Sequence, residues 1–407
     1  MIFVFLLLLL TGNTQPLMAE NPPRGYYKDV FMDSGVGLTS RKVLPVEKVL
    51  GLSGELYLTQ EDSDRQNALI GGNKEDENGI LLYPDGQPRF RMVFMNGGKA
   101  SRHLGSLSDK AADAFRQFVR AGGSYLGCCA GAYLGSVKYL GLWPGRARFT
   151  GLNKSWTAMA FEPGSVLSLD ARFGGKMQID SVRHNGGCFA QMEDAPEGTE
   201  ILARYAMQGR LPELGLDSLP SVWAYKASER CGRVILCGSH PEGAATGENL
   251  ALMSALVRYA LEGCGEPVLK GELVPGEPRR MTAGSADRNP AFTCIGDRQY
   301  HHFRIPVPKG TKAVEIRLEG VEGRKNFDLY LAASPEGFAF LSDAPWCNVQ
   351  PGTDKTLTVE RPAAGALWIS VYCATTVTHR QGEGGLEYSG RTDVLNGVPY
   401  ILTSRLL

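Results

Sequence analysis

Cys129 carries the strongest signal for chemistry in this 407-residue chain, because it lies at the centre of the turn Gly127–Gly131. A Gly-x-nucleophile-x-Gly turn between a strand and a helix exposes its central side chain at the top of a sheet. The glycines let strand and helix approach closely, and the start of a helix favours a thiolate. We predict Cys129 to be a nucleophile and Cys128 to be a small buried hydrophobe. The alternative is a structural cysteine in a glycine-rich turn.

A second polar segment, His240-Pro241-Glu242, follows the apolar, strand-like residues 233–237. Pro241 favours an extended conformation at His240, and residues i and i+2 of an extended segment point to the same side. We therefore predict that His240 is the base for Cys129 and that Glu242 orients its imidazole, as in acyl-transfer enzymes. The alternative is a surface histidine.

A third segment, Asn96-Gly97-Gly98, follows the strand-like residues 90–95. The backbone N–H groups of a Gly-Gly turn can point into a site, so we predict an oxyanion hole formed by Gly98 and Ala130. A loop glycine pair is the alternative. Three such segments at successive strand ends, in the order oxyanion loop, nucleophile, His-x-Glu, are harder to obtain by chance.

Together these segments resemble the class I glutamine amidotransferase-like superfamily, and residues 123–133 most resemble the biotin–protein ligase N-terminal-type domain. The resemblance covers roughly residues 26–264 and implies a flavodoxin-like α/β fold with a Cys-His-Glu triad. Glutamine-hydrolysing members usually carry Gln shortly after the nucleophile, whereas this chain has Ala132-Tyr133. Acyl transfer is therefore predicted, but glutamine itself is not predicted as the substrate.

The segment His184-Asn185-Gly186-Gly187 has two interpretations. Asn-Gly is a strong β-turn signal, whereas similar glycine pairs in the family imply a loop beside the catalytic cysteine. Substrate contacts are expected from residues that flank the triad: Asn96, Gly97, Tyr133, His184 and Asn185.

Strand-like and helical patterns alternate through residue 264, which predicts a parallel sheet with helices on both faces and a site at the carboxyl ends of the strands. Strands are expected at 28–32 and 54–58, a short helix at 45–50, and longer helices after Ser108 and over 249–261. This part is long enough to bury its own core.

Proline, glycine and charged residues dominate 265–290, which predicts a linker with few crossing contacts. Short alternating strands over 291–407 predict a β-sandwich. Residues 326–331, 351–353 and 365–372 resemble the bacterial pre-peptidase C-terminal domain. That resemblance implies a jelly-roll-like module that attaches to a glycan or another cell-surface polymer.

The first residues, 1–19, read as a secretory signal, so export to the periplasm or the extracellular space is expected, with no membrane span after cleavage. Export permits disulfides, and we favour Cys347 with Cys373 among the nine cysteines. The 43 basic and 43 acidic residues cancel, so no nucleic-acid partner is expected. No metal or other cofactor is predicted.

The sequence therefore predicts an exported cysteine hydrolase that cleaves an amide, γ-glutamyl or peptide bond of a small-molecule or peptide substrate through an acyl-enzyme. The alternative is a binding protein that keeps the pocket without turnover and uses the sandwich as its attachment module.

Overall fold

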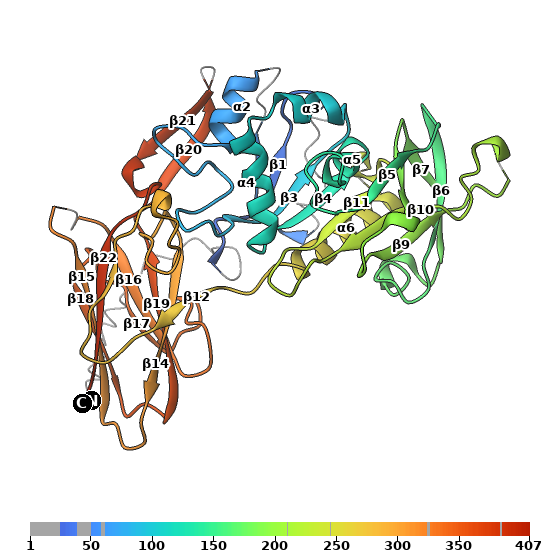
Figure 1. Cartoon of the computed structure of the whole chain (residues 1–407). Helices are drawn as coiled ribbons and strands as arrows, with labels where there is room; N and C mark the ends of the chain where they lie inside the picture. The colour runs from blue at the N-terminus through green and yellow to red at the C-terminus, as the bar shows by residue number, and fades with distance from the viewer. Residues whose placement is uncertain are drawn as a thin grey trace, which may run out of the picture.

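The computed structural model (Figure 1) describes residues 25–38, 50–57, 62–209, 211–244, 246–323, 326–382 and 385–407. The predicted signal segment 1–19 and nearly all of the predicted helix at 45–50 lie outside these residues. Among the residues that are described, no helix is long and apolar enough to cross a membrane.

The first part is a mixed α/β unit around a nine-stranded sheet in the order β2-β1-β3-β4-β11-β10-β9-β6-β7. Five strands are mutually parallel, namely β2 (Gly54–Tyr57), β1 (Lys28–Asp33), β3 (Phe90–Met95), β4 (Ser124–Cys128) and β11 (Val234–Cys237). The next four pair antiparallel, namely β10 (Pro220–Tyr225), β9 (Glu200–Tyr205), β6 (Ser155–Phe161) and β7 (Gln178–His184). The predicted parallel sheet is thus only part of the sheet. A parallel connection needs a crossover of about a dozen residues or more, and only residues 226–233 join β10 to β11.

Helices pack on both faces of this sheet. The helices are α2 (Ser63–Ile70), α3 (Ala100–Ser106), α4 (Asp109–Arg120), α5 (Ala130–Gly135) and α6 (Gly247–Glu262). One core cluster joins α6 to one face of the sheet, and a second joins α4 to the other. Ser108 accepts a hydrogen bond from the Ala111 N–H, as expected of an N-cap residue, and Gly263 caps the end of α6.

Shorter elements complete the first part. A two-stranded ribbon pairs β5 (Arg146–Phe149) with β8 (Cys188–Gln191). Single 3-10 turns of this part lie at Ala171–Phe173, Met192–Asp194, Pro212–Leu214 and Pro241–Gly243, and two more, Ser285–Asp287 and Thr392–Val394, belong to the second part.

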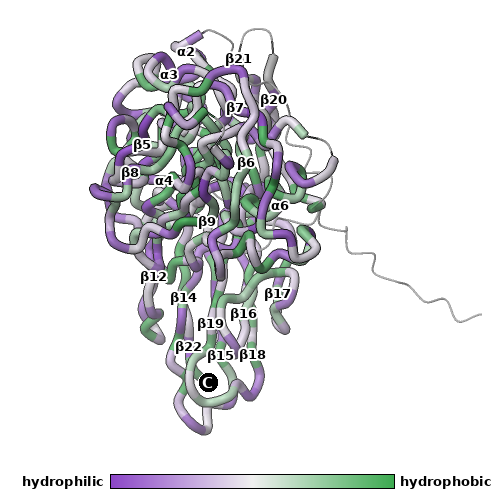
Figure 2. The backbone as a smooth tube through the Cα atoms, turned by 90° about the vertical axis from the view of Figure 1, so that its right-hand side faces the viewer, coloured by the Kyte–Doolittle hydropathy of each residue, from purple (hydrophilic) through white to green (hydrophobic). Residues whose placement is uncertain are grey.

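The second part is a β-sandwich, which in Figure 2 forms a narrower lobe beside the α/β part. One sheet has the order β12 (Leu269–Glu272), β14 (Tyr300–Val307), β19 (Gly365–Cys373), β16 (Leu329–Ser334) and β17 (Trp346–Asn348). The other has the order β13 (Arg279–Met281), β22 (Tyr400–Leu406), β15 (Ala313–Gly320) and β18 (Lys355–Glu360), and a hairpin of β20 (Val377–Gly382) and β21 (Gly385–Gly390) stands apart. Alternate residues of β18 are buried, and both sheets contribute to one core.

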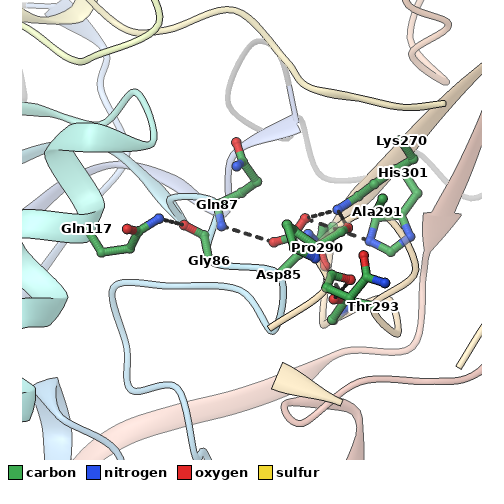
Figure 3. A network of polar contacts seen from close by, with 12 residues as sticks. Asp85, Gly86, Gln87, Gln117, Lys270, Pro290, Ala291, Thr293 and His301 are labelled. Atoms are coloured by element: carbon green, nitrogen blue, oxygen red, sulfur yellow. Dashed lines mark hydrogen bonds and ion pairs between the residues drawn. The ribbon is translucent and has the colours of Figure 1, made fainter. Parts of the chain in front are cut away.

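The stretch 265–290 differs from the expected linker, because it supplies β12 and β13 to the two sheets. Polar contacts also join the two parts of the chain (Figure 3). The Lys270 ammonium lies 2.5 Å from the Asp85 carboxylate and donates to the Pro290 carbonyl at 2.6 Å. His301 Nε2 lies 4.0 Å from the same carboxylate, and the side chains of Lys270 and Asp85 are almost fully buried. The two parts therefore share a buried, charged interface.

All nine cysteines are free thiols, so the favoured disulfide is absent. Cys347 lies on β17 and Cys373 on β19, and β16 separates these strands. Two strand spacings amount to about 10 Å, which exceeds the reach of a disulfide.

Candidate functional site

Cys129 follows β4 directly and occupies the left-handed region, with φ 51° and ψ −105°. Such a conformation costs about 1–3 kcal/mol and is found mainly at functional sites. The turn needs both of its glycines, because a Cβ on Gly127 would lie 2.4 Å from the Gly131 backbone and one on Gly131 would lie 2.2 Å from the Met95 carbonyl. The Cys129 N–H donates to the Cys237 carbonyl at 2.9 Å. The turn is thus held between the ends of β3, β4 and β11.

His240 lies beside Cys129, close enough for the thiol to influence its pKa. Its Nδ1 lies 2.8 Å from Glu242 Oε1, and Glu242 is buried. Burial lowers the pKa of His240, but the hydrogen bonds to Cys129 and Glu242 and their charges outweigh burial and raise it to about 10. The contact with Glu242 differs from the expected one, because Pro241–Gly243 forms a 3-10 turn rather than an extended segment. This turn places the Glu242 carboxylate beside the His240 ring.

Gly97 gives the imidazole its space. A Cβ on Gly97 would lie 2.5 Å from His240 Cε1. The Gly97 N–H donates to the Asn96 side chain at 2.9 Å, while the Asn96 carbonyl accepts from the Gly131 N–H at 3.1 Å. Asn96 is buried, so the structure places it as a brace between the glycine loop and the nucleophile turn rather than as an exposed substrate contact.

Two backbone N–H groups near Cys129 lack a backbone acceptor within the described ranges, those of Gly98 and Ala130. Ala130 is the first residue of α5, so its N–H has no partner within the helix. Gly98 has φ 149° and forms an isolated antiparallel bridge with Leu38. These are the two donors expected from the sequence, at the end of β3 and the start of α5.

The loop 184–187 lies against the nucleophile. Cys129 Sγ is 3.5 Å from the Asn185 carbonyl, and the Tyr133 hydroxyl donates to the Gly187 carbonyl at 3.0 Å. The Asn185 side chain accepts from the Lys154 N–H at 3.0 Å. A hairpin at Asn-Gly is not what forms, because β7 pairs with β6 and β8 pairs with β5. The loop instead crosses between the large sheet and the ribbon.

His184 is buried beneath this loop and bridges two hydroxyl groups, those of Ser239 at Nδ1 and Thr150 at Nε2, each at 2.8 Å. Burial and the charge of His240 lower its pKa to about 4. A neutral histidine with both ring nitrogens bound to hydroxyl groups holds this loop in place, and its predicted contact with a substrate stays a prediction. The sequence analysis did not single out Ser239 or Thr150, since their role depends on contacts between distant strands.

The other cysteines near the site are buried. Cys128 is fully buried, as expected, and lies opposite Cys237 on the neighbouring strand. The side-chain interaction with Cys237 and burial raise the pKa of Cys128 far above its ordinary value. Burial does the same for Cys188. These two thiols are therefore inert neighbours of Cys129.

A buried pair that the sequence analysis missed lies beyond the glycine loop. Asp33 ends β1, and its carboxylate lies 3.3 Å from His103 Nε2 in α3. A polar, glycine-rich segment, residues 33–37, follows β1 just as residues 96–98 follow β3. The same strand-end signal could therefore have drawn attention to Asp33.

Residues 81–140 match the sequence-family model described as "Biotin-protein ligase, N terminal". No curated protein matches the chain. Among solved structures, PurLQS from Thermotoga maritima is 13% identical with a TM-score of 0.37, over 57% of this chain and 99% of that chain. The pre-peptidase C-terminal domain of a collagenase from Bacillus anthracis is 9% identical with a TM-score of 0.20, over 35% of this chain and 100% of that one. A beta-galactosidase from Bacillus circulans sp. alkalophilus is 11% identical with a TM-score of 0.33, over 84% of this chain and 41% of that one.

These structural similarities are distant. The family match contains two of the three strand-end segments, the turn at Cys129 and Asn96–Gly98, but it ends before His240. The first part of the chain is therefore similar, over those residues, to a biotin-protein ligase N-terminal domain.

Proposed function

We propose that this protein is an exported cysteine hydrolase of the amidotransferase-like type, which cleaves an amide, γ-glutamyl or peptide bond. The observation that carries the proposal is the contact of Cys129, held in a left-handed turn, with His240, which Glu242 holds in turn at 2.8 Å. A nucleophile, a base within hydrogen-bond reach and a carboxylate that orients the base are the three parts of acyl-transfer catalysis.

The proposed reaction begins when the Cys129 thiolate attacks the carbonyl carbon of the substrate. The resulting oxyanion accepts hydrogen bonds from the Gly98 and Ala130 N–H groups. The His240 imidazolium then gives its proton to the leaving amine, the C–N bond breaks, and a thioester remains on Cys129. His240 next takes a proton from water, which attacks the thioester; the acid is released and the thiolate–imidazolium pair is restored.

The alternative is a protein that binds a ligand in this pocket without turnover. One observation favours it: the Asn185 carbonyl lies 3.5 Å from Cys129 Sγ, and Cys129 is only 4% exposed. Loop 184–187 would have to move for a carbonyl group to reach the thiol.

For the scaffold, we propose a flavodoxin-like arrangement of the parallel strands and a jelly-roll-like sandwich that attaches to a glycan or another surface polymer. The 9% identical collagenase domain gives this last role no support beyond the resemblance in sequence motifs.

The first test is labelling by iodoacetamide at mildly acidic pH, followed by peptide mapping. We expect stoichiometric alkylation of Cys129 in the wild type and none of the buried Cys128. Cys129→Ala should abolish both labelling and turnover in a screen of amide, γ-glutamyl and peptide substrates, whereas Cys128→Ala should retain both and lose stability. An unreactive Cys129 would favour the binding protein, and loss of activity only in Cys128→Ala would overturn the assignment of the nucleophile.

A further inference from the structure

The loop that follows β1, residues 34–38, lies alongside the glycine loop that carries the proposed oxyanion donor; we call it the β1 loop. Leu38 forms an antiparallel bridge with Gly98, and the Lys99 N–H donates to the Gly37 carbonyl at 2.7 Å. Gly37 has φ 80°, and a Cβ there would lie 2.9 Å from the His103 backbone nitrogen. The position of Gly98 therefore depends on the position of the β1 loop.

The Asp33–His103 pair fixes the β1 loop at its base. Asp33 Oδ1 accepts from the Gly35 N–H at 2.9 Å, and Asp33 Oδ2 lies 3.3 Å from His103 Nε2. His103 Nδ1 lies 2.9 Å from the Val36 carbonyl. Both side chains of the pair are at most 2% exposed. One imidazole thus joins the end of β1, the β1 loop and α3.

The contacts define the protonation of one ring nitrogen. The Val36 carbonyl can only accept a hydrogen bond, so His103 Nδ1 carries a proton, while Nε2 faces the Asp33 carboxylate at 3.3 Å. Burial lowers the pKa of His103, but the Asp33 carboxylate and the hydrogen bonds to it and to Val36 raise it overall. The other titratable group that senses Asp33 is Tyr125 on β4, whose pKa burial raises far above its ordinary value, so it stays neutral. Asp33 and the Val36 carbonyl are therefore the two groups that favour protonated His103.

We propose that the buried Asp33–His103 ion pair is a positioning pair for acyl transfer, which holds the Gly97–Gly98 loop against Cys129 and His240. The inference rests on the proposed function for its catalytic consequence. The pair touches neither substrate nor the reacting atoms. It acts through the β1 loop on the Gly98 N–H of the glycine loop.

The pair should affect oxyanion stabilisation and leave the nucleophile itself intact. Loss of one oxyanion donor costs about 10²–10³ in rate, so a displaced donor should cost about 10–100-fold in acylation. Alkylation by iodoacetamide forms no oxyanion, so its rate should not change. If the pair contributed only to stability, its loss would lower the acylation and alkylation rates together or change neither.

The test uses Asp33→Asn in the full-length protein, because it removes the charge without leaving an unpaired buried carboxylate. His103→Gln is the second variant, in case the first does not fold. The matched control is His302→Gln, which removes another buried histidine, bonded to Ser370 in the sandwich. Three quantities are measured: hydrogen exchange of the Lys99 amide, alkylation of Cys129 by iodoacetamide, and acylation by p-nitrophenyl acetate.

We expect Lys99 exchange to rise at least about tenfold in the folded pair variants, acylation to fall, and alkylation to stay unchanged, with none of these changes in the control. Both ring N–H resonances of His103 should also be present in the wild type at pH 6, because its pKa is raised above the ordinary 6.5. Unchanged Lys99 exchange, or a neutral His103 at pH 6, overturns the positioning pair whether or not the protein is an enzyme. A wild type that neither alkylates nor acylates overturns the proposed function alone, since the exchange measurement still decides on the pair.

Discussion

Replacing Glu242 by Gln should move the reactivity of Cys129 to higher pH. The pKa of His240 is raised from its ordinary 6.5 to about 10. That shift corresponds to about 5 kcal/mol at about 1.4 kcal/mol per unit, and it is the net result after burial, the largest single effect, has acted in the opposite direction. Loss of the charged hydrogen bond to Glu242 should weaken the imidazolium by about 2 kcal/mol. Because the His240 side chain is only 17% exposed, solvent screens its interaction with Glu242 only weakly.

The assay is the rate of Cys129 alkylation by iodoacetamide from pH 4 to pH 10. The imidazolium favours the neighbouring thiolate, so weakening it should shift the profile of Glu242→Gln upward by about one to two pH units. His240→Ala should shift it further, because it removes the whole imidazolium. The matched control is Glu248→Gln, which removes the partner of Lys176 in a surface ion pair and should leave the profile in place.

The sign of the pH dependence gives a second check. A raised histidine pKa stabilises the folded state fully below pH 6.5, and this stabilisation is lost as pH rises through about 10. Turnover, which needs the imidazolium as acid, should fall over the same upper range. If the profiles of Glu242→Gln and His240→Ala coincide with that of the wild type, His240 is not paired with Cys129 and the triad is refuted.

Three further predictions concern packing and charge. Gly97→Ala should reduce turnover by about 10²-fold with the fold intact by circular dichroism, because the new Cβ would lie 2.5 Å from the His240 ring and displace it. Lys270→Met should lower the free energy of unfolding in urea by about 3–5 kcal/mol, since it leaves the Asp85 carboxylate buried and unpaired. Adding Asp85→Asn to this variant should recover part of the lost stability. If the two substitutions instead have additive costs, the reasoning is contradicted. Stability should fall as pH decreases from 6.5 to about 4, by about 4 kcal/mol per pH unit near pH 5, and a flat profile of unfolding free energy in that range would contradict it. Asp297, whose pKa burial raises to about 6, partly offsets this loss of stability. The groups responsible for the loss are four buried histidines with lowered pKa values: His184, His301, His302 and His379.

The signals that could be found in the sequence are local ones. The turn at Cys129 can be recognised from its own residues, because a Cβ on Gly127 would meet the Gly131 backbone four residues away. The need for glycine at position 131 comes instead from the Met95 carbonyl, which is distant in sequence. His240 and Glu242 are likewise neighbours, and their strand was recognisable by its apolar run. Parallel strands then bring their carboxyl ends to one edge of the sheet, which accounts for the proximity of segments more than a hundred residues apart.

The features that the sequence did not reveal depend on distant contacts. The alternating α/β pattern of the sequence predicts parallel strands throughout, but the antiparallel strands β6, β7, β9 and β10 have no helical crossovers between them. The proline and glycine content of residues 265–290 predicts a linker, but β12 and β13 are edge strands, where such residues are tolerated. Asp33 and His103 lie seventy residues apart, and only the path of the β1 loop brings them together.

The sandwich also has a structural connection to the site that a separable attachment module would lack. Its hairpin strand β21 contacts α2 and the segment that follows it, where the Asn73 side chain donates to the Tyr388 hydroxyl at 3.3 Å. Gln66 of α2 accepts from the Val36 N–H of the β1 loop at 2.7 Å, and that loop pairs with Gly98. Removal of the sandwich would therefore free both the buried Asp85 carboxylate and the support of α2. We expect a chain ending near residue 266 to lose solubility or activity on small substrates, whereas retention of full activity and an unchanged melting temperature would show that the first part needs neither contact.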